Sequence, residues 1–286
     1  MEFIKMHGLG NDFIVLDYFA REPGDVDYAA LARELCHRQF GIGGDGLIII
    51  LPSGVADARM RIINLDGSEA EMCGNGIRCC ARYTYERGYV CHNPLRIETL
   101  AGVLTLELTM VDDRVTGVKV DMGEPVLAGP LIPVALTGEP VVGAGLEAAG
   151  REFEFTAVSM GNPHCVIFGA QLSDRDFRIF GPAIERHELF PRRTNVEFTQ
   201  VDSPTELTVR VWERGAGPTL ACGTGACAAA VAAILNGLTE RRVTVHLPGG
   251  DLLVEWAADN HVYMTGPATY VFRGEWLGTA ESLPGR

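Results

Sequence analysis

The chain is short of positive charge. Of its 286 residues, 24 are Lys or Arg and 37 are Asp or Glu, which gives a formal net charge of −13. Binding to nucleic acid or to an anionic membrane requires clustered positive charge, which this chain cannot easily assemble. We therefore expect no nucleic-acid partner and no membrane partner, and we expect a small molecule instead.

Long apolar runs are also missing. The longest, Ala226–Leu235, covers about half of a membrane span. The first residues carry Glu2 and Lys5, where a signal peptide would need its apolar core. These observations predict a cytoplasmic location.

The eight cysteines contain no Cys-x-x-Cys pair, so the spacing does not indicate a zinc site and no metal is expected. In the reducing cytoplasm the cysteines are expected to be thiols. Most lone cysteines are small buried hydrophobic residues. We apply that interpretation to Cys36, Cys79, Cys80, Cys91, Cys165 and Cys227.

The other two cysteines, Cys73 and Cys222, each stand in a glycine turn before a predicted helix. The turns read Met72–Gly76 and Ala221–Gly225, and Cys222 follows Cys73 by 149 positions. Three other pairs keep nearly the same spacing: 149 positions between Gly88 and Gly237, 149 between Asn64 and Glu213, and 151 between Asn11 and Asn162. The length suits two domains, and the matched spacings predict that one domain has been duplicated.

Strand patterns dominate both halves, and one helix is expected directly after each cysteine, over 77–87 and 226–235. A helix is also predicted over 27–37 with Asp27 as its N-cap. The simplest fold is α+β, with two pseudo-symmetric domains, each a curved, mainly antiparallel β-sheet or barrel around a central helix. We expect domains at 1–120, with 267–286 returning to it, and at 121–266. The Gly- and Pro-rich segment 123–150 is interpreted as the passage between them.

The segment Gly41–Gly46 matches G-x-G-x-x-G, a pattern found in dinucleotide-binding sites. That site requires a strand before the glycines and a helix after them. Here the order is reversed, because an apolar run, 47–51, follows. A glycine turn leading into a buried strand is the preferred interpretation.

A cysteine at the start of a helix lies near unpaired backbone N–H groups, which favour a thiolate and can bind an anion. If the two domains face each other, two such thiols can act on one carbon from opposite faces. One thiol removes a proton and the other returns a proton with inversion, so neither a metal nor pyridoxal phosphate is required. An enolate formed on a bound carboxylate would be stabilised at the helix N-termini.

Together the motifs resemble those of the diaminopimelate epimerases, in order, over nearly the whole chain. They are Met6–Phe13, Asn64 with Asp66–Ser68, Met72–Gly76, Gly161–His164, Glu213–Gly217 and Ala221–Gly225. The resemblance implies a homodimeric, cofactor-independent isomerase of lysine and peptidoglycan-precursor biosynthesis. It would interconvert LL- and meso-2,6-diaminopimelate.

The resemblance also implies roles for individual residues. Cys73 and Cys222 would be the two acid/base thiols, and His164 and Glu213 would support catalysis. Glu213 would also accept from a substrate ammonium. The substrate-binding positions would be Asn11, Asn64, Gly74, Asn75, Asn162, Asn195, Glu213, Arg214, Gly223 and Thr224. Some members carry a glutamine where this chain has Gly46, so no side-chain contact is expected there.

Alternatives remain for the residues and for the function. The asparagines can be turn residues, Glu213 and Arg214 an exposed pair, and His164 a packed residue that does not touch substrate. A proline or hydroxyproline racemase uses the same two-thiol chemistry but tends to carry histidine at the position of Asn75. A phenazine-biosynthesis isomerase lacks the cysteine pair. A non-catalytic redox thiol protein would oxidise or bind without turnover.

Overall fold

The computed structural model describes residues 1–20, 24–169 and 172–278. The chain forms two compact units, which we describe separately. Unit 1 comprises 1–120 with the segment from 266 onward, and unit 2 comprises 121–265. The assignment of 1–120 with 267–286 and of 121–266 as two epimerase domains stays a prediction, and 279–286 lies outside the described residues.

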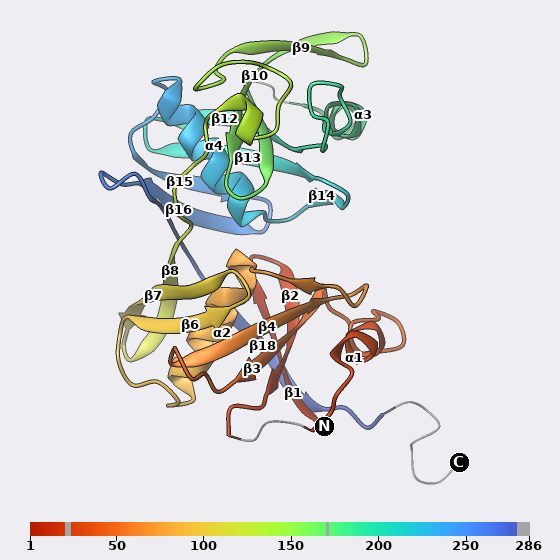
Figure 1. Cartoon of the computed structure of the whole chain (residues 1–286), viewed down its shortest axis with the longest axis vertical. Helices are drawn as coiled ribbons and strands as arrows, with labels where there is room; N and C mark the ends of the chain where they lie inside the picture. The colour runs from red at the N-terminus through yellow and green to blue at the C-terminus, as the bar shows by residue number, and fades with distance from the viewer. Residues whose placement is uncertain (21–23, 170–171, 279–286) are drawn as a thin grey trace. The chain divides into compact units, whose positions relative to one another are not determined.

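Unit 1 is built on one curved sheet (Figure 1). Its strands are β1 (Glu2–Gly8), β2 (Asn11–Asp17), β3 (Gly46–Leu51), β4 (Ala58–Asn64), β5 (Glu69–Ala70), β6 (Leu95–Thr99), β7 (Gly102–Val111), β8 (Arg114–Asp121) and β18 (Thr269–Glu275). Most neighbours pair antiparallel, whereas β2 with β3 and β4 with β6 pair parallel. Helix α2 (Gly74–Glu86) packs against β1, β3, β4 and β6, and α1 (Tyr28–Leu35) packs against β3 and β4.

Unit 2 contains β9 (Ala144–Ala148), β10 (Arg151–Ser159), β11 (Pro163–Phe168), β12 (Asn195–Ser203), β13 (Glu206–Glu213), β14 (Gly217–Thr219), β15 (Arg242–Leu247), β16 (Gly250–Trp256) and β17 (Val262–Gly266). It also contains the short helix η1 (Gly129–Leu131) and the helices α3 (Asp174–Glu185) and α4 (Gly223–Leu235). Helix α4 contacts β10, β11, β12, β13, β15 and β16, and its residues from Gly225 to Ala233 are all buried.

The two units repeat one order of strand pairing. In unit 1 the hairpin β1–β2 is followed by a parallel pairing to β3, a hairpin to β4 with the short β5, and a parallel pairing to β6. In unit 2 the hairpin β10–β11 is followed by a parallel pairing to β12, a hairpin to β13 with the short β14, and a parallel pairing to β15. Each short strand directly precedes a cysteine and its helix. The predicted α+β fold with an internal repeat and a central helix in each half is confirmed.

Both central helices begin earlier than predicted. The structure includes Gly74 and Gly223 as the first residues of α2 and α4, so the glycines form the first turn of each helix. Packing requires the small size of the glycines that follow: a Cβ on Gly76 would lie 2.6 Å from Ile62 Cδ1, and one on Gly225 would lie 2.8 Å from Glu197 Oε1. Helix α2 ends as predicted, because Gly88 adopts a positive φ of 74° directly after the C-cap Arg87.

Several other predictions are tested directly. Asp27 caps α1, since its side chain accepts from Ala30 N–H, and Gly41–Gly46 leads into the buried strand β3 as expected. The interpretation of 123–150 as a passage between domains is wrong. Ile132, Val134 and Val141 of that segment belong to the apolar core of unit 2.

Two further features differ from the predictions. Cys91 is exposed rather than buried, because it lies in the loop after α2. Helix α3 was not predicted. Its N-cap Ser173 accepts from Asp176 N–H, which is a recognisable start signal, but Pro182 interrupts the later helical pattern.

Candidate active site

Cys73 occupies the N-cap of α2 with an extended backbone (φ −143°, ψ 120°) and is partly exposed. Its thiol lies 3.7 Å from Asn11 Oδ1 and can donate to it. Asn11 Oδ1 also accepts from Asn75 Nδ2 at 3.1 Å. The structure thus brings together three of the predicted residues of unit 1, since Asn11 opens β2 and Asn75 lies in the first turn of α2.

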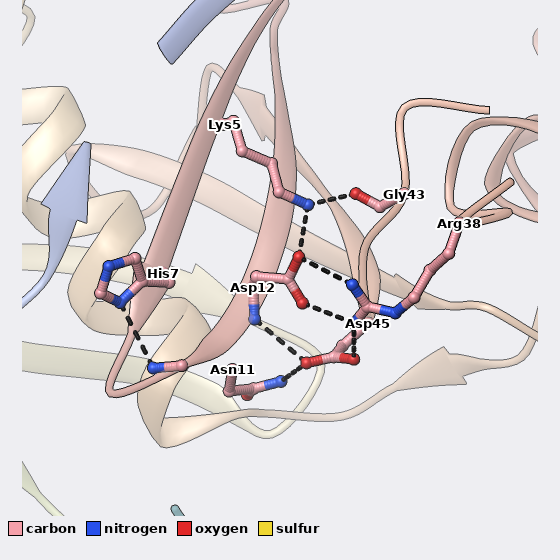
Figure 2. Close-up of polar contacts among 8 residues, drawn as sticks. Lys5, His7, Asn11, Asp12, Arg38, Gly43 and Asp45 are labelled. Atoms are coloured by element: carbon pink, nitrogen blue, oxygen red, sulfur yellow. Dashed lines mark hydrogen bonds and ion pairs between the residues drawn. The ribbon is translucent and has the colours of Figure 1, made fainter. Parts of the chain in front are cut away.

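The Asn11 amide is held from its other side by a carboxylate. Asn11 Nδ2 donates to Asp45 Oδ2 at 2.8 Å, and Asp12 N–H donates to the same oxygen at 3.1 Å. Arg38 bridges Asp45 and Asp12 with contacts of 2.7 Å to each, and Lys5 pairs with Asp12 at 2.6 Å and donates to Gly43 O (Figure 2). Partial burial by itself would raise the pKa of Asp12, but Arg38 and Lys5 outweigh it and lower that pKa to about 2.

Asn64, the last residue of β4, begins a turn. Its Nδ2 donates to Ser68 Oγ at 3.0 Å, and Gly67 N–H donates to Asn64 O at 2.9 Å. The described contacts of its side chain therefore hold the 64–68 turn.

Cys222 is the N-cap of α4 and is buried. Its sulfur accepts from Gly225 N–H at 3.4 Å and lies 3.5 Å from Thr224 Oγ1. Burial raises the pKa of the Cys222 thiol well above its ordinary value, and the negative charges of Glu213 and Glu197 raise it further. The sequence predicted that the helix N-terminus favours a thiolate here, but in unit 2 desolvation and neighbouring carboxylates outweigh that effect. Cys222 is therefore a thiol at neutral pH.

A chain of hydrogen bonds extends from Cys222 into the interior of unit 2. Thr224 Oγ1 accepts from Asn162 Nδ2 at 3.3 Å, and Asn162 Oδ1 lies 2.9 Å from His164 Nε2. His164 Nδ1 lies 2.7 Å from Glu197 Oε1, and both of these side chains are fully buried. Burial raises the pKa of Glu197, although His164 opposes that change. In this structure His164 is therefore linked to Cys222 through two intervening residues, Asn162 and Thr224.

The remaining predicted residues of unit 2 are at the ends of β12 and β13. Asn195 is buried; its Nδ2 donates to Pro163 O and its Oδ1 accepts from Arg214 N–H, both at 2.9 Å. Arg214 also donates to Arg192 O at 3.2 Å. Glu213 Oε1 accepts from Thr219 Oγ1 at 2.9 Å. Asn195 thus supports the backbone that carries Arg214.

Three residues next to the predicted ones were missed: Asp45, Arg78 and Glu197. Glu197 lies in a strand of buried residues, where a charged side chain is unusual enough to be noticed. Arg78 is fully buried although nothing in the helical pattern of α2 signals it, and Asp45 stands among glycines whose pattern indicates only a turn. Among residues 1–20, 24–169 and 172–278, no group of three or more His, Cys, Asp or Glu side chains could hold a metal ion.

A model of the family "Diaminopimelate epimerase" matches residues 3–128 and 156–271. The chain belongs to the diaminopimelate epimerase family. The diaminopimelate epimerase of Desulfitobacterium hafniense is 68% identical over 99% of this chain and 100% of the relative. The diaminopimelate epimerase of Moorella thermoacetica is 57% identical over 96% of this chain and 99% of the relative.

Solved structures share the fold of the diaminopimelate epimerase family at low sequence identity. A Bacillus anthracis phenazine biosynthesis protein of the PhzF family is 19% identical with a TM-score of 0.68, covering 97% of this chain and 99% of that one. A probable proline racemase from Agrobacterium radiobacter is 16% identical with a TM-score of 0.68, covering 96% and 92%. The described part of the chain has no helix long and apolar enough to cross a membrane.

Proposed function

We propose that this chain epimerises LL-2,6-diaminopimelate to the meso isomer by proton transfer between the substrate α-carbon and two thiols, Cys73 and Cys222. The observation that carries the proposal is the equivalent place of the two cysteines. Each is the N-cap of a central helix that opens with glycines, after a short strand, in a repeated order of pairing. Membership of the family supplies the substrate.

Inversion at the α-carbon needs one thiolate and one thiol. The thiolate removes the α-proton from one face, and the thiol delivers its proton to the opposite face. The roles exchange when the reaction runs backwards. Because burial keeps Cys222 protonated, Cys222 suits the proton donor and Cys73 the base in one direction. The thiols exchange protons with the substrate and no redox change occurs, so the step needs no cofactor.

The substrate carboxylate at the reacting carbon would be held by the N–H groups of the two helix starts, Gly74–Asn75 and Gly223–Thr224. Charge developing on that carboxylate in the transition state would be stabilised in the same place. His164 would support catalysis from the interior through Asn162 and Thr224.

The second end of diaminopimelate is itself a zwitterion and would be recognised by opposite charges. Glu213 would accept from the ammonium and Arg214 would bind the carboxylate, for which a guanidinium is well shaped. Asn11, Asn64, Asn162 and Asn195 complete the proposed set. Asn195 would act by holding the Arg214 backbone, to which it is hydrogen-bonded.

The proposal is tested by incubating the reduced protein with LL-diaminopimelate in deuterated water. Deuterium is expected at the α-carbon together with the meso isomer, and both are expected to disappear in the double variant Cys73→Ala, Cys222→Ala. Absence of deuterium in the native protein contradicts the epimerase, and exchange that persists in the double variant contradicts the two-thiol mechanism. Exchange of L-proline instead of diaminopimelate would identify a proline racemase.

The proposal extends to assembly and location. A homodimer in the cytoplasm is the state that the family resemblance and the charge pattern favour. Light scattering tests the first part, since a dimer has about twice the 30.9 kDa mass of one chain.

A further inference from the structure

A directed chain of hydrogen bonds passes beside Cys73 and joins two charged residues outside the predicted site. It begins at Arg78, whose NH2 group donates to Asn75 Oδ1 at 2.8 Å. Asn75 Nδ2 donates to Asn11 Oδ1 at 3.1 Å, and Asn11 Nδ2 donates to Asp45 Oδ2 at 2.8 Å. Every member belongs to unit 1.

The two ends determine which way both amides face. A guanidinium can only donate hydrogen bonds and a carboxylate can only accept them, whereas an amide can do either by turning over. With Arg78 at one end and Asp45 at the other, only one orientation of Asn75 and Asn11 satisfies all three bonds. That orientation directs Asn11 Oδ1, an acceptor, at the Cys73 thiol.

Each end is itself anchored. Arg78 is fully buried and donates also to Gly74 O at 3.0 Å and to Pro267 O at 3.1 Å. Gly8 leaves room for it, since a Cβ there would lie 2.9 Å from the Arg78 NH2 group. Asp45 is held by Arg38, as Figure 2 shows. Rotation of the Asp45 side chain would therefore break its ion pair with Arg38, and rotation of the Arg78 side chain would leave a buried charge without its acceptors.

We propose that Asp45 and Arg78 are positioning residues that fix the Asn11 amide so that its oxygen accepts from the Cys73 thiol. This inference rests on the proposed function, in which Cys73 is a base. An acceptor stabilises the protonated thiol over the thiolate, which makes the thiolate a stronger base for an α-proton that is hard to remove. The proton taken from substrate then ends on sulfur, hydrogen-bonded to Asn11.

The test uses Asp45→Asn in the full chain. Arg38 would attract the new amide oxygen, so the new NH2 group would face Asn11 and favour a turned-over Asn11 amide, against the opposing bond from Asn75 and at the cost of the bond from Asp12 N–H. In the molecules whose Asn11 amide has turned over, a donor faces Cys73 and favours the thiolate. We measure the rate of Cys73 alkylation by iodoacetamide against pH in a Cys222→Ala background, with the labelled cysteine identified by mass spectrometry. The midpoint of the profile is expected at lower pH. At a pH below both midpoints, lowering the midpoint by about one pH unit raises the thiolate fraction about tenfold. The rate rises by about three- to fourfold, because a less basic thiolate is a weaker nucleophile.

Glu98→Gln is the matched control. This substitution also removes one negative charge from unit 1, and like Asp45 the native Glu98 pairs with an arginine, Arg59, at 3.8 Å. Glu98 accepts from Ser53 Oγ and is not hydrogen-bonded to Asn11 or Asn75 in the described contacts. Its alkylation profile is expected to match that of the parent. If the Asp45→Asn protein does not fold by circular dichroism, Asp45→Ala removes the acceptor without adding a donor, and a smaller change of the midpoint in the same direction is expected.

A profile that is unchanged, or displaced to higher pH, in the folded Asp45 variants overturns the proposal. The alkylation assay requires no substrate, so its outcome is separate from that of the proposed function. Lack of α-deuterium exchange in the native protein would remove the epimerase while leaving the positioning of Asn11 intact.

Discussion

Glu197 shows how burial alters a single carboxyl group. It is fully buried, and its Oε2 atom has no hydrogen-bond partner in the part of the chain that the structure describes. Burial raises its pKa above the ordinary value of 4.5. In the folded state the proton is held more tightly than in the unfolded state, so this group contributes stability at low pH that is lost as the pH rises through its folded-state pKa.

The variant Glu197→Gln removes this titration. The difference in unfolding free energy, variant minus parent, is expected to increase between pH 5 and pH 8. As the pH rises, the folded parent must either ionise its buried carboxyl or keep a proton that the unfolded chain has already lost, and both destabilise it. The glutamine of the variant has no such cost. Urea denaturation at the two pH values measures the difference. A difference that is constant or decreases with pH would show that the pair with His164, rather than desolvation, dominates.

Glu213 is expected to influence the Cys222 thiol through its charge. Burial is the main cause of the raised pKa of Cys222, and Glu213 adds to it, so Glu213→Gln should lower that pKa and increase the alkylation rate of Cys222 at pH 8. The rate is measured in a Cys73→Ala background. Glu206→Gln, at the other end of β13 and exposed, serves as the control and should leave the rate unchanged. Equal Cys222 alkylation rates in the Glu213→Gln and Glu206→Gln proteins would show that Glu213 does not contribute to the raised pKa of Cys222.

At the scale of the element, α4 reverses an ordinary rule of helix stability. Gly to Ala within a helix usually stabilises by about 1 kcal/mol. Gly225→Ala is expected to destabilise by about 1–3 kcal/mol instead, because the new Cβ would meet Glu197 Oε1 at 2.8 Å and Cys222 Sγ at 3.3 Å. Gly223→Ala should cost less, since its Cβ would meet the flexible end of Met264 at 3.1 Å. Chemical denaturation compares the two, and equal losses would contradict the argument.

Elements also differ in how well their sequence predicts them. Helix α1 was predictable from Asp27 and the apolar spacing after it, because both signals are local. Helix α3 was missed although Ser173 caps it, since Pro182 lies within it and its apolar face packs against residues far along the chain. Local signals therefore predicted the elements whose ends are set by their own residues.

For the whole molecule, the repeat and the two cysteine turns could be recognised in the sequence because they recur at nearly constant spacing. The residues that support the cysteines could not be recognised in this way. Asp45 is explained by its bond to Asn11 and Arg78 by its bond to Pro267, and the fold brings each pair together from distant parts of the chain. Sequence reasoning thus predicted the thiols and missed the groups that orient their neighbours.

Unit 1 is closed by the segment 266–278, and its stability should depend on that segment. β18 pairs with β1, Arg78 donates to Pro267 O, and Arg82 donates to Ala268 O. Truncation after Thr265 is expected to lower the unfolding temperature of unit 1, because β1 loses a neighbour and a buried guanidinium loses an acceptor. Differential scanning calorimetry of the truncated and full chains measures this. The same midpoint and enthalpy for both would contradict it.

The return of residues 266–278 to unit 1 also sets an order of events during synthesis. A ribosome releases all of unit 2 before it releases Pro267 and β18. Domains commonly complete their folding from the N-terminus onward, but here the N-terminal unit is the last to receive its final strand. The surroundings of Arg78, and with them the hydrogen-bonded neighbours of Cys73, are therefore completed only after all of unit 2 has been synthesised.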